Sequence, residues 1–94
     1  MDGKKILSIV QVYRDLCEAR SASKATFPSE QYVNSRDEVV AHCHGMLDQI
    51  EEFVQQGRTE KAFRWLGFIQ GCLWSQRLST LADLKNDNRP DPAS

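Results

Sequence analysis

Two histidines flank a cysteine at His42, Cys43 and His44, and these residue types are common zinc ligands. On a helix, two positions apart is a rotation of about 200° around the axis, so the two imidazoles diverge and cannot share one ion. Only His44 with Asp48, one turn further on, could bind a metal jointly. The spacing therefore predicts no metal site.

The sequence also offers no well-placed residues for nucleophilic or acid–base catalysis. Cys43 falls on an apolar row, where burial raises the pKa of a thiol and keeps it inert. Glu51 and Glu52 are adjacent on a solvated face. Neither burial nor a neighbour is expected there to give the two carboxyl groups the different pKa values that a general acid and a general base need. Neither GxxxxGK[ST] nor GxGxxG occurs, which excludes the ordinary phosphate-binding loops. We expect no catalytic residue and no cofactor, and hence no enzyme.

Basic and aromatic residues are interleaved along the chain. The cations are Arg20, Lys24, Arg58, Lys61, Arg64 and Arg77, and the rings are Tyr13, Phe27, Phe63, Trp65 and Trp74. Rings that stack a base, beside cations that bind a phosphate, make a site for a small nucleotide or single-stranded nucleic acid. Composition alone favours the alternative that the rings are core residues and the cations are solvated.

Tyr13 and Lys24 form the sharpest local candidate for such a site. Tyr13 lies at the edge of an apolar helical stripe, where its ring can stay half exposed. Arg20 lies further along the same helix, and the loop at 21–24 adds hydroxyls and an ammonium group. We predict that Tyr13 stacks a base while Lys24, with Arg20, pairs with a phosphate.

The composition bounds the fold and the partners. The chain has 94 residues, 40% hydrophobic and 27% charged, which is one domain over 1–94. Its net charge of −1 argues against duplex DNA and against an anionic membrane as partners. The absence of a long apolar run or signal-like segment predicts a cytoplasmic location. The charge is segregated, at −4 over 35–56 and +3 over 57–78.

Hydrophobic spacing predicts an all-α fold: a short N-terminal helix, a long antiparallel helical hairpin and a short C-terminal helix. The predicted helices are 4–21, 36–56, 60–77 and 81–87, with a loop at 22–34 and a tail at 88–94. The predicted N-terminal caps are Asp2, Ser35, Thr59 and Thr80. Gly57 is expected to end the second helix.

The helix predicted at 60–77 is apolar on two sides. One face is expected to pack on helix 36–56; it contains Ala62, Trp65, Leu66, Ile69, Cys72, Leu73 and Gln76. The other row contains Phe63, Gly67, Gln70, Gly71 and Trp74. Each glycine inside a helix costs about 1 kcal/mol relative to alanine, so close approach by a partner helix or flat ligand is expected there.

Two arrangements would cover this second row. In the first, copies of the chain associate through Phe63, Gly67, Gly71 and Trp74, giving an oligomeric bundle. In the second, the short C-terminal helix folds back over the glycines within one chain, using Leu78, Leu81 and Leu84.

The chain resembles the second family of small phage anti-CBASS proteins, which sequester cyclic nucleotides without cleaving them. The resemblance rests on the chain length, the helix order, Tyr13 followed by Lys24, and the string RWLGFIQGCLW at 64–74. It implies a hexamer in the host bacterial cytoplasm, with cyclic dinucleotides such as 3′,3′-cGAMP between pairs of N-terminal regions. It also implies a separate cyclic trinucleotide site in some members, for which Arg64 is the expected phosphate partner.

Two functions follow as expectations. The first is a phage immune-evasion sponge for cyclic dinucleotides, with or without cyclic trinucleotides. The alternative is a small helical protein of phage origin that inhibits or adapts another protein through the row of Phe63, Gly67, Gly71 and Trp74.

Overall fold

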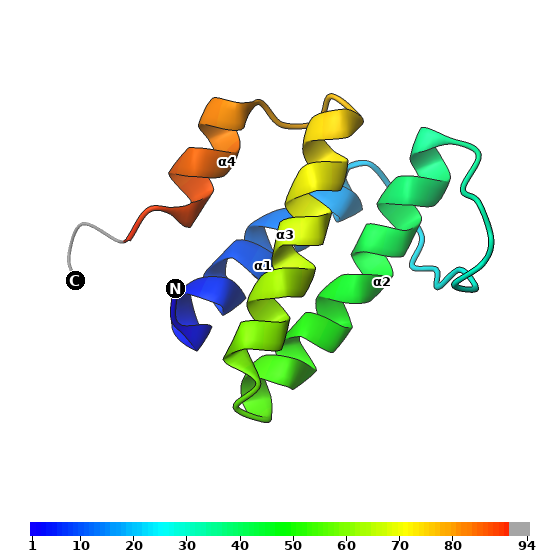
Figure 1. Ribbon diagram of the computed structural model, residues 1–94. Coiled ribbons are helices and arrows are strands. Elements are labelled where there is room, and N and C mark those ends of the chain that lie inside the picture. Colours follow the sequence, from blue (N-terminus) through cyan, green and yellow to red (C-terminus); the bar gives the residue numbers. More distant parts are fainter. Residues whose placement is uncertain (91–94) are drawn as a thin grey trace.

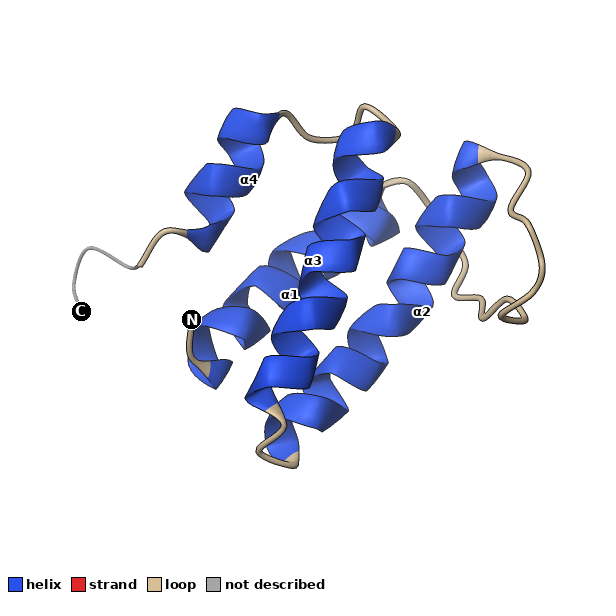
Figure 2. Ribbon diagram, viewed as in Figure 1, coloured by secondary structure: helices blue, strands red, loops and turns tan. Residues whose placement is uncertain are grey.

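The computed structural model describes residues 1–90, which contain four helices and no strand (Figures 1 and 2). The helices are α1 (Gly3–Ala19), α2 (Arg36–Gln55), α3 (Thr59–Ser75) and α4 (Leu81–Asn88). The all-α prediction is confirmed, and each helix end lies within two residues of its predicted position. Asn88 belongs to α4 rather than to the predicted tail, of which residues 91–94 lie outside the described part. Within residues 1–90, no helix combines the length and apolar character needed to cross a bilayer.

Three of the four predicted caps are confirmed. In each, the cap side chain accepts a hydrogen bond from the backbone N–H three residues later. The pairs are Asp2 with Lys5, Ser35 with Glu38 and Thr80 with Asp83. The Asp83 carboxylate also accepts from the Thr80 N–H, which completes a capping box at the start of α4.

The fourth predicted cap, Thr59, is wrong, because it is the first residue of α3 and Arg58 precedes it without a side-chain cap bond. The tight turn from α2 explains the shift. Gly57 adopts φ +75°, and the Arg58 N–H donates to the Phe53 carbonyl at 2.8 Å. This Schellman closure brings the chain straight into α3.

Three helices enclose the core. Figure 1 shows α2 and α3 side by side, joined by the turn at Gly57, with α1 behind α3. The largest fully buried side chains come from α1, α2 and α3: Ile6, Val10, Leu47, Ile50, Leu66 and Ile69. Burying each contributes roughly 1.5–3 kcal/mol to folding, so the three-four spacing of apolar residues holds these helices together.

The first part of the long loop, residues 22–27, is a strap that lies against α2. The Ala25 N–H donates to the Ala41 carbonyl at 3.0 Å, and His44 Nδ1 lies 3.1 Å from the Ala22 carbonyl oxygen. A Cβ on Gly45 would lie 2.5 Å from the Ala25 carbonyl oxygen, so glycine is required for this approach. The strap is therefore fixed by backbone contacts with α2.

Polar side chains attach α4 to the rest of the protein. The Tyr13 hydroxyl donates to Asp87 Oδ2 at 2.8 Å and accepts from Gln70 Nε2 at 3.1 Å. The Gln70 and Asn88 amides exchange two hydrogen bonds, at 2.6 and 3.1 Å. Since α4 has no buried residue of its own, these contacts decide where it lies.

Candidate functional site

A pocket of about 450 Å³ opens between α2 and α3, within the size range of small-molecule sites. The strap, α2 and α3 all contribute to its lining: Thr26, His42, Met46, Gln49, Arg64, Trp65 and Phe68. Arg64 brings the one guanidinium to otherwise neutral, largely apolar walls. The pocket thus combines aromatic surface with one positive charge.

Aromatic rings from three elements meet at this pocket. The His42 ring lies 5.9 Å from the Phe27 ring and 6.5 Å from the Phe68 ring, the latter nearly edge-on at 74°. The Phe27 N–H donates a long 3.4 Å bond to His42 Nδ1, so a neutral ring carries its proton on Nε2. Phe68 is 55% exposed, which leaves a face available for stacking.

Trp65 forms a fixed wall of the same pocket. Its ring packs edge-on against Phe53, with centroids 4.9 Å apart and planes at 82°. An edge-to-face pair of this kind adds about 0.5–1.5 kcal/mol beyond area burial, so Trp65 is held in place while Phe68 remains accessible.

Arg64 is available to an anion. Its Nη1 donates to Glu60 Oε1 at 3.1 Å, and the two side chains are 63% and 89% exposed. An exposed pair one helical turn apart contributes about 0.3–0.5 kcal/mol. Because this exposed pair holds Arg64 only weakly, a phosphate that can accept two guanidinium N–H groups can compete with Glu60 for it.

The expectation that the Tyr13 ring is half exposed is wrong, because Tyr13 is 2% exposed. Its ring lies in the core, and its hydroxyl is held by Asp87 and Gln70. Burial raises the pKa of Tyr13 well above its ordinary value; the hydrogen bond from Gln70 lowers it in part, and Asp87 raises it again. The ring has no face for a base in this structure.

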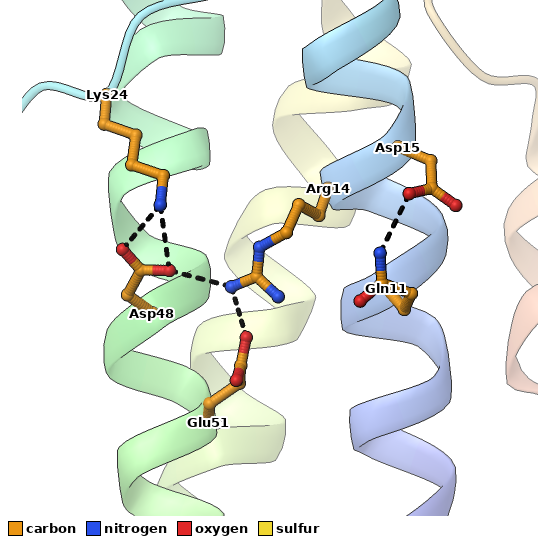
Figure 3. Close-up of polar contacts among 6 residues, drawn as sticks. All are labelled: Gln11, Arg14, Asp15, Lys24, Asp48 and Glu51. Carbon is orange, nitrogen blue, oxygen red and sulfur yellow. Dashed lines mark hydrogen bonds and ion pairs between the residues drawn. The ribbon is translucent and has the colours of Figure 1, made fainter.

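Lys24 belongs to an ion-pair network that links α1 and the strap to α2 (Figure 3). Its Nζ lies 2.9 Å from Asp48 Oδ2, and Arg14 Nη2 lies 2.8 Å from Asp48 Oδ1. Arg14 also pairs with Glu51. Lys24 and Tyr13 thus contact different partners, and one chain does not bring them together in a single site.

Acid should weaken this network. The hydrogen bond from Lys24, and then that from Arg14, hold the pKa of Asp48 below its ordinary value. A lowered folded-state pKa stabilises the fold above the ordinary pKa, and this contribution is lost as the pH falls through the folded-state pKa. We expect Asp48→Asn to flatten the acid limb of stability by less than about 1 kcal/mol, because Asp48 is half exposed. Urea unfolding from neutral pH to strong acid measures this; parallel curves for both proteins would contradict it.

Arg20 lies in a different hollow from the α2–α3 pocket. It follows α1 and lines a polar depression of about 550 Å³ together with Ser21, Ser23 and Asp37. The serine hydroxyls expected beside Arg20 are therefore present, and the Asp37 carboxylate lines the same depression. Arg20 does not line the pocket that contains Arg64.

The predicted interface row of α3 is open. Phe63 is 45% exposed and Trp74 is 53% exposed. A Cβ built on Gly67 or Gly71 meets no atom of residues 1–90 within 4 Å, its own helix backbone and chain neighbours aside. The alternative in which helix 81–87 covers the glycines is therefore wrong, because α4 is attached to Tyr13 and Gln70 instead.

The two histidines have different surroundings, and two of the cysteines contact each other. His42 faces Phe27 and Phe68, whereas His44 is buried against Ala22; within residues 1–90 no cluster of three or more metal-ligand side chains occurs. The hydrogen bond to Cys72, followed by burial, raises the pKa of Cys43. Searches against protein-family models, curated proteins and solved structures find no match for this chain.

Proposed function

We propose that this protein is a non-enzymatic binding protein that takes up cyclic oligonucleotides intact in the pocket between α2 and α3. The observation that carries the proposal is the placement of the Arg64 guanidinium on the rim of a pocket with an exposed Phe68 ring. A base stacks on Phe68 and a phosphate pairs with Arg64. The His42 ring lines the same pocket and adds a further aromatic surface.

The ligand class follows from what one chain offers. Each pocket presents one exposed ring and one guanidinium, which match one base and one phosphate. A cyclic ligand repeats that unit two or three times with internal symmetry, so it can engage the same pocket on several copies. Sequestration requires tight binding, of order nanomolar or about −12 kcal/mol, and no turnover.

This proposal moves the site away from the N-terminal helix. A base cannot stack on Tyr13 without displacing α4, and a phosphate would have to separate Lys24 from Asp48. Arg64 has only the weak contact with Glu60 to lose. The expected trinucleotide partner, Arg64, therefore becomes the centre of the site.

Calorimetric titration with 3′,3′-cGAMP and a panel of cyclic di- and trinucleotides tests the proposal. We expect sub-micromolar binding of at least one ligand. Arg64→Gln and Phe68→Ala should each weaken it at least about tenfold, the equivalent of about 1.4 kcal/mol. Arg58→Gln is the matched control, because Arg58 carries the same charge but lies over Phe53, outside the pocket lining.

Three results would contradict the proposal. One is the absence of heat with every ligand of the panel. Another is an equal loss of affinity for Arg58→Gln and Arg64→Gln, which would indicate attraction by net charge alone. The third is recovery of a cleaved ligand after heating the complex, because the proposal requires the bound molecule to be released intact.

A further inference from the structure

The outer face of α3 is a shallow groove with a glycine floor. At about 100° per residue, Gly67 and Gly71 lie along the centre of the exposed face, and Phe63 and Trp74 stand along one edge. Arg64 lies on the opposite side of the two glycines, towards the α2–α3 pocket. Because a Cβ at either glycine would enter open space, the backbone of another helix can approach this face at close range.

The two ends of this groove carry different chemistry. At the N-terminal end, Glu60 and Arg64 form a solvent-exposed pair. At the C-terminal end, Trp74 and Arg77 line one hollow of about 580 Å³. The groove therefore has an acid and a guanidinium at one end, and an indole and a guanidinium at the other.

Arg77 is held at this end by an unusual backbone. It has φ +63°, in the left-handed region that favours glycine, and its N–H donates to the Trp74 carbonyl at 3.1 Å. A non-glycine residue costs about 1 kcal/mol or more there. Arg77 therefore holds the C′ position of the Schellman closure that ends α3, in which the Leu78 N–H donates to the Leu73 carbonyl at 2.8 Å.

We propose that a second copy of this chain docks on the groove with its α3 antiparallel, so that Gly67 of each copy meets Gly71 of the other. This register places Arg64 level with Trp74 of the second copy, on the other edge of the groove, and brings Glu60 next to Arg77 of the second copy. The two-fold symmetry makes this charge pair occur twice. A parallel pairing would instead bring Arg64 against Arg64 and Arg77 against Arg77, which like-charge repulsion opposes.

The pairing leaves the α2–α3 pocket of each copy accessible, because the two-fold symmetry keeps Trp74 of the second copy on the edge of the groove away from that pocket. The pairing itself needs no ligand, so it can hold or fail independently of nucleotide binding.

Size-exclusion chromatography with light scattering on the ligand-free chain tests the pairing. We expect an even number of copies. Arg77→Glu and Glu60→Arg should each weaken association at least about tenfold, and the double variant should recover affinity relative to both. Thermal melting by circular dichroism shows whether each variant retains its fold, and Glu60→Arg gives an independent reading if Arg77→Glu unfolds.

Substitution of the two glycines gives a second test, in which the stability of the isolated chain and its association should change in opposite directions. Gly67→Ala with Gly71→Ala should stabilise the isolated chain, yet weaken association by at least about tenfold, because the added methyl groups fill the line of closest approach. A chain that stays monomeric at millimolar concentration would overturn the proposal and leave the groove to a different protein. The proposal would also be overturned if the two alanines left association unaffected. A double charge-reversal variant that recovered no affinity relative to the single variants would overturn it as well.

Discussion

Replacing Tyr13 by alanine is expected to lower the free energy of unfolding by about 3–5 kcal/mol, the range for removing a large aromatic side chain from a core. The ring is 2% exposed and packs among buried residues of α1, α2 and α3. The substitution also removes the hydroxyl that joins Asp87 to Gln70, so the side-chain attachment of α4 is reduced to the Gln70–Asn88 hydrogen bonds. Chemical denaturation followed by circular dichroism measures the loss.

Tyr13→Phe is the matched control, because it keeps the ring and removes only the hydroxyl. We expect a loss of about 1–2 kcal/mol from the hydrogen bonds to Asp87 and Gln70. Its affinity for a cyclic oligonucleotide should equal that of the unchanged protein. If Tyr13→Ala costs less than about 1 kcal/mol, the ring is not the core residue described above.

Gly45→Ala is expected to lower the free energy of unfolding by about 1–3 kcal/mol, the usual cost of overpacking. Its Cβ would lie 2.5 Å from the Ala25 carbonyl oxygen, which is backbone and cannot turn aside as a long side chain can. The strap would have to leave α2 and give up the Ala25–Ala41 hydrogen bond. Urea unfolding of the full chain measures the change.

Gly67→Ala supplies the comparison for Gly45→Ala. Both glycines lie inside helices, but a Cβ at Gly67 enters open space, so alanine there should stabilise the monomer by up to about 1 kcal/mol. The two substitutions should therefore have opposite signs. A similar effect at both positions would mean that helix propensity, and not the contact with Ala25, decides the outcome at Gly45.

The helices could be predicted from the sequence because their apolar spacing and their caps agree. Each of Asp2, Ser35 and Thr80 precedes a run with three-four spacing, and each makes the expected backbone hydrogen bond. The cap predicted at Thr59 is wrong because the Schellman closure around Gly57 places Arg58, not Thr59, at the cap position. Local patterns identify elements well but do not place each terminal residue.

The placement of Tyr13 could not be predicted in this way. Its position at the edge of a helical stripe is compatible with an exposed or a buried ring. The hydroxyl partner, Asp87, lies 74 residues further along the chain, and no local spacing indicates that α4 returns to α1. Tertiary contacts of this range decide burial.

The Lys24 network was indicated by charge, although no spacing identified it. Residues 35–56 carry a net charge of −4, which attracts cations from neighbouring elements. Arg14 and Lys24 supply them by pairing with Asp48 and Glu51. Lys24 was predicted to bind a phosphate, and no role was predicted for Arg14.

Sequence reasoning found Arg64 but missed the rings that accompany it. His42 was weighed only as a metal ligand, and Phe68 was assigned to neither apolar row of α3. An apolar residue outside the packing face of a helix, with no element available to cover it, is the sign that could have identified Phe68. Phe68 is 55% exposed and lines the pocket with His42.

Titration of the isotope-labelled protein with a cyclic oligonucleotide, followed by amide chemical shifts, distinguishes the α2–α3 pocket from the N-terminal helix as the binding site. We expect the perturbed amides to gather around the pocket, at His42, Met46, Arg64 and Phe68. Those of Tyr13 should stay unchanged. Shifts that centre instead on α1 and the strap near Lys24, or no shifts with any cyclic di- or trinucleotide, would contradict binding at this pocket.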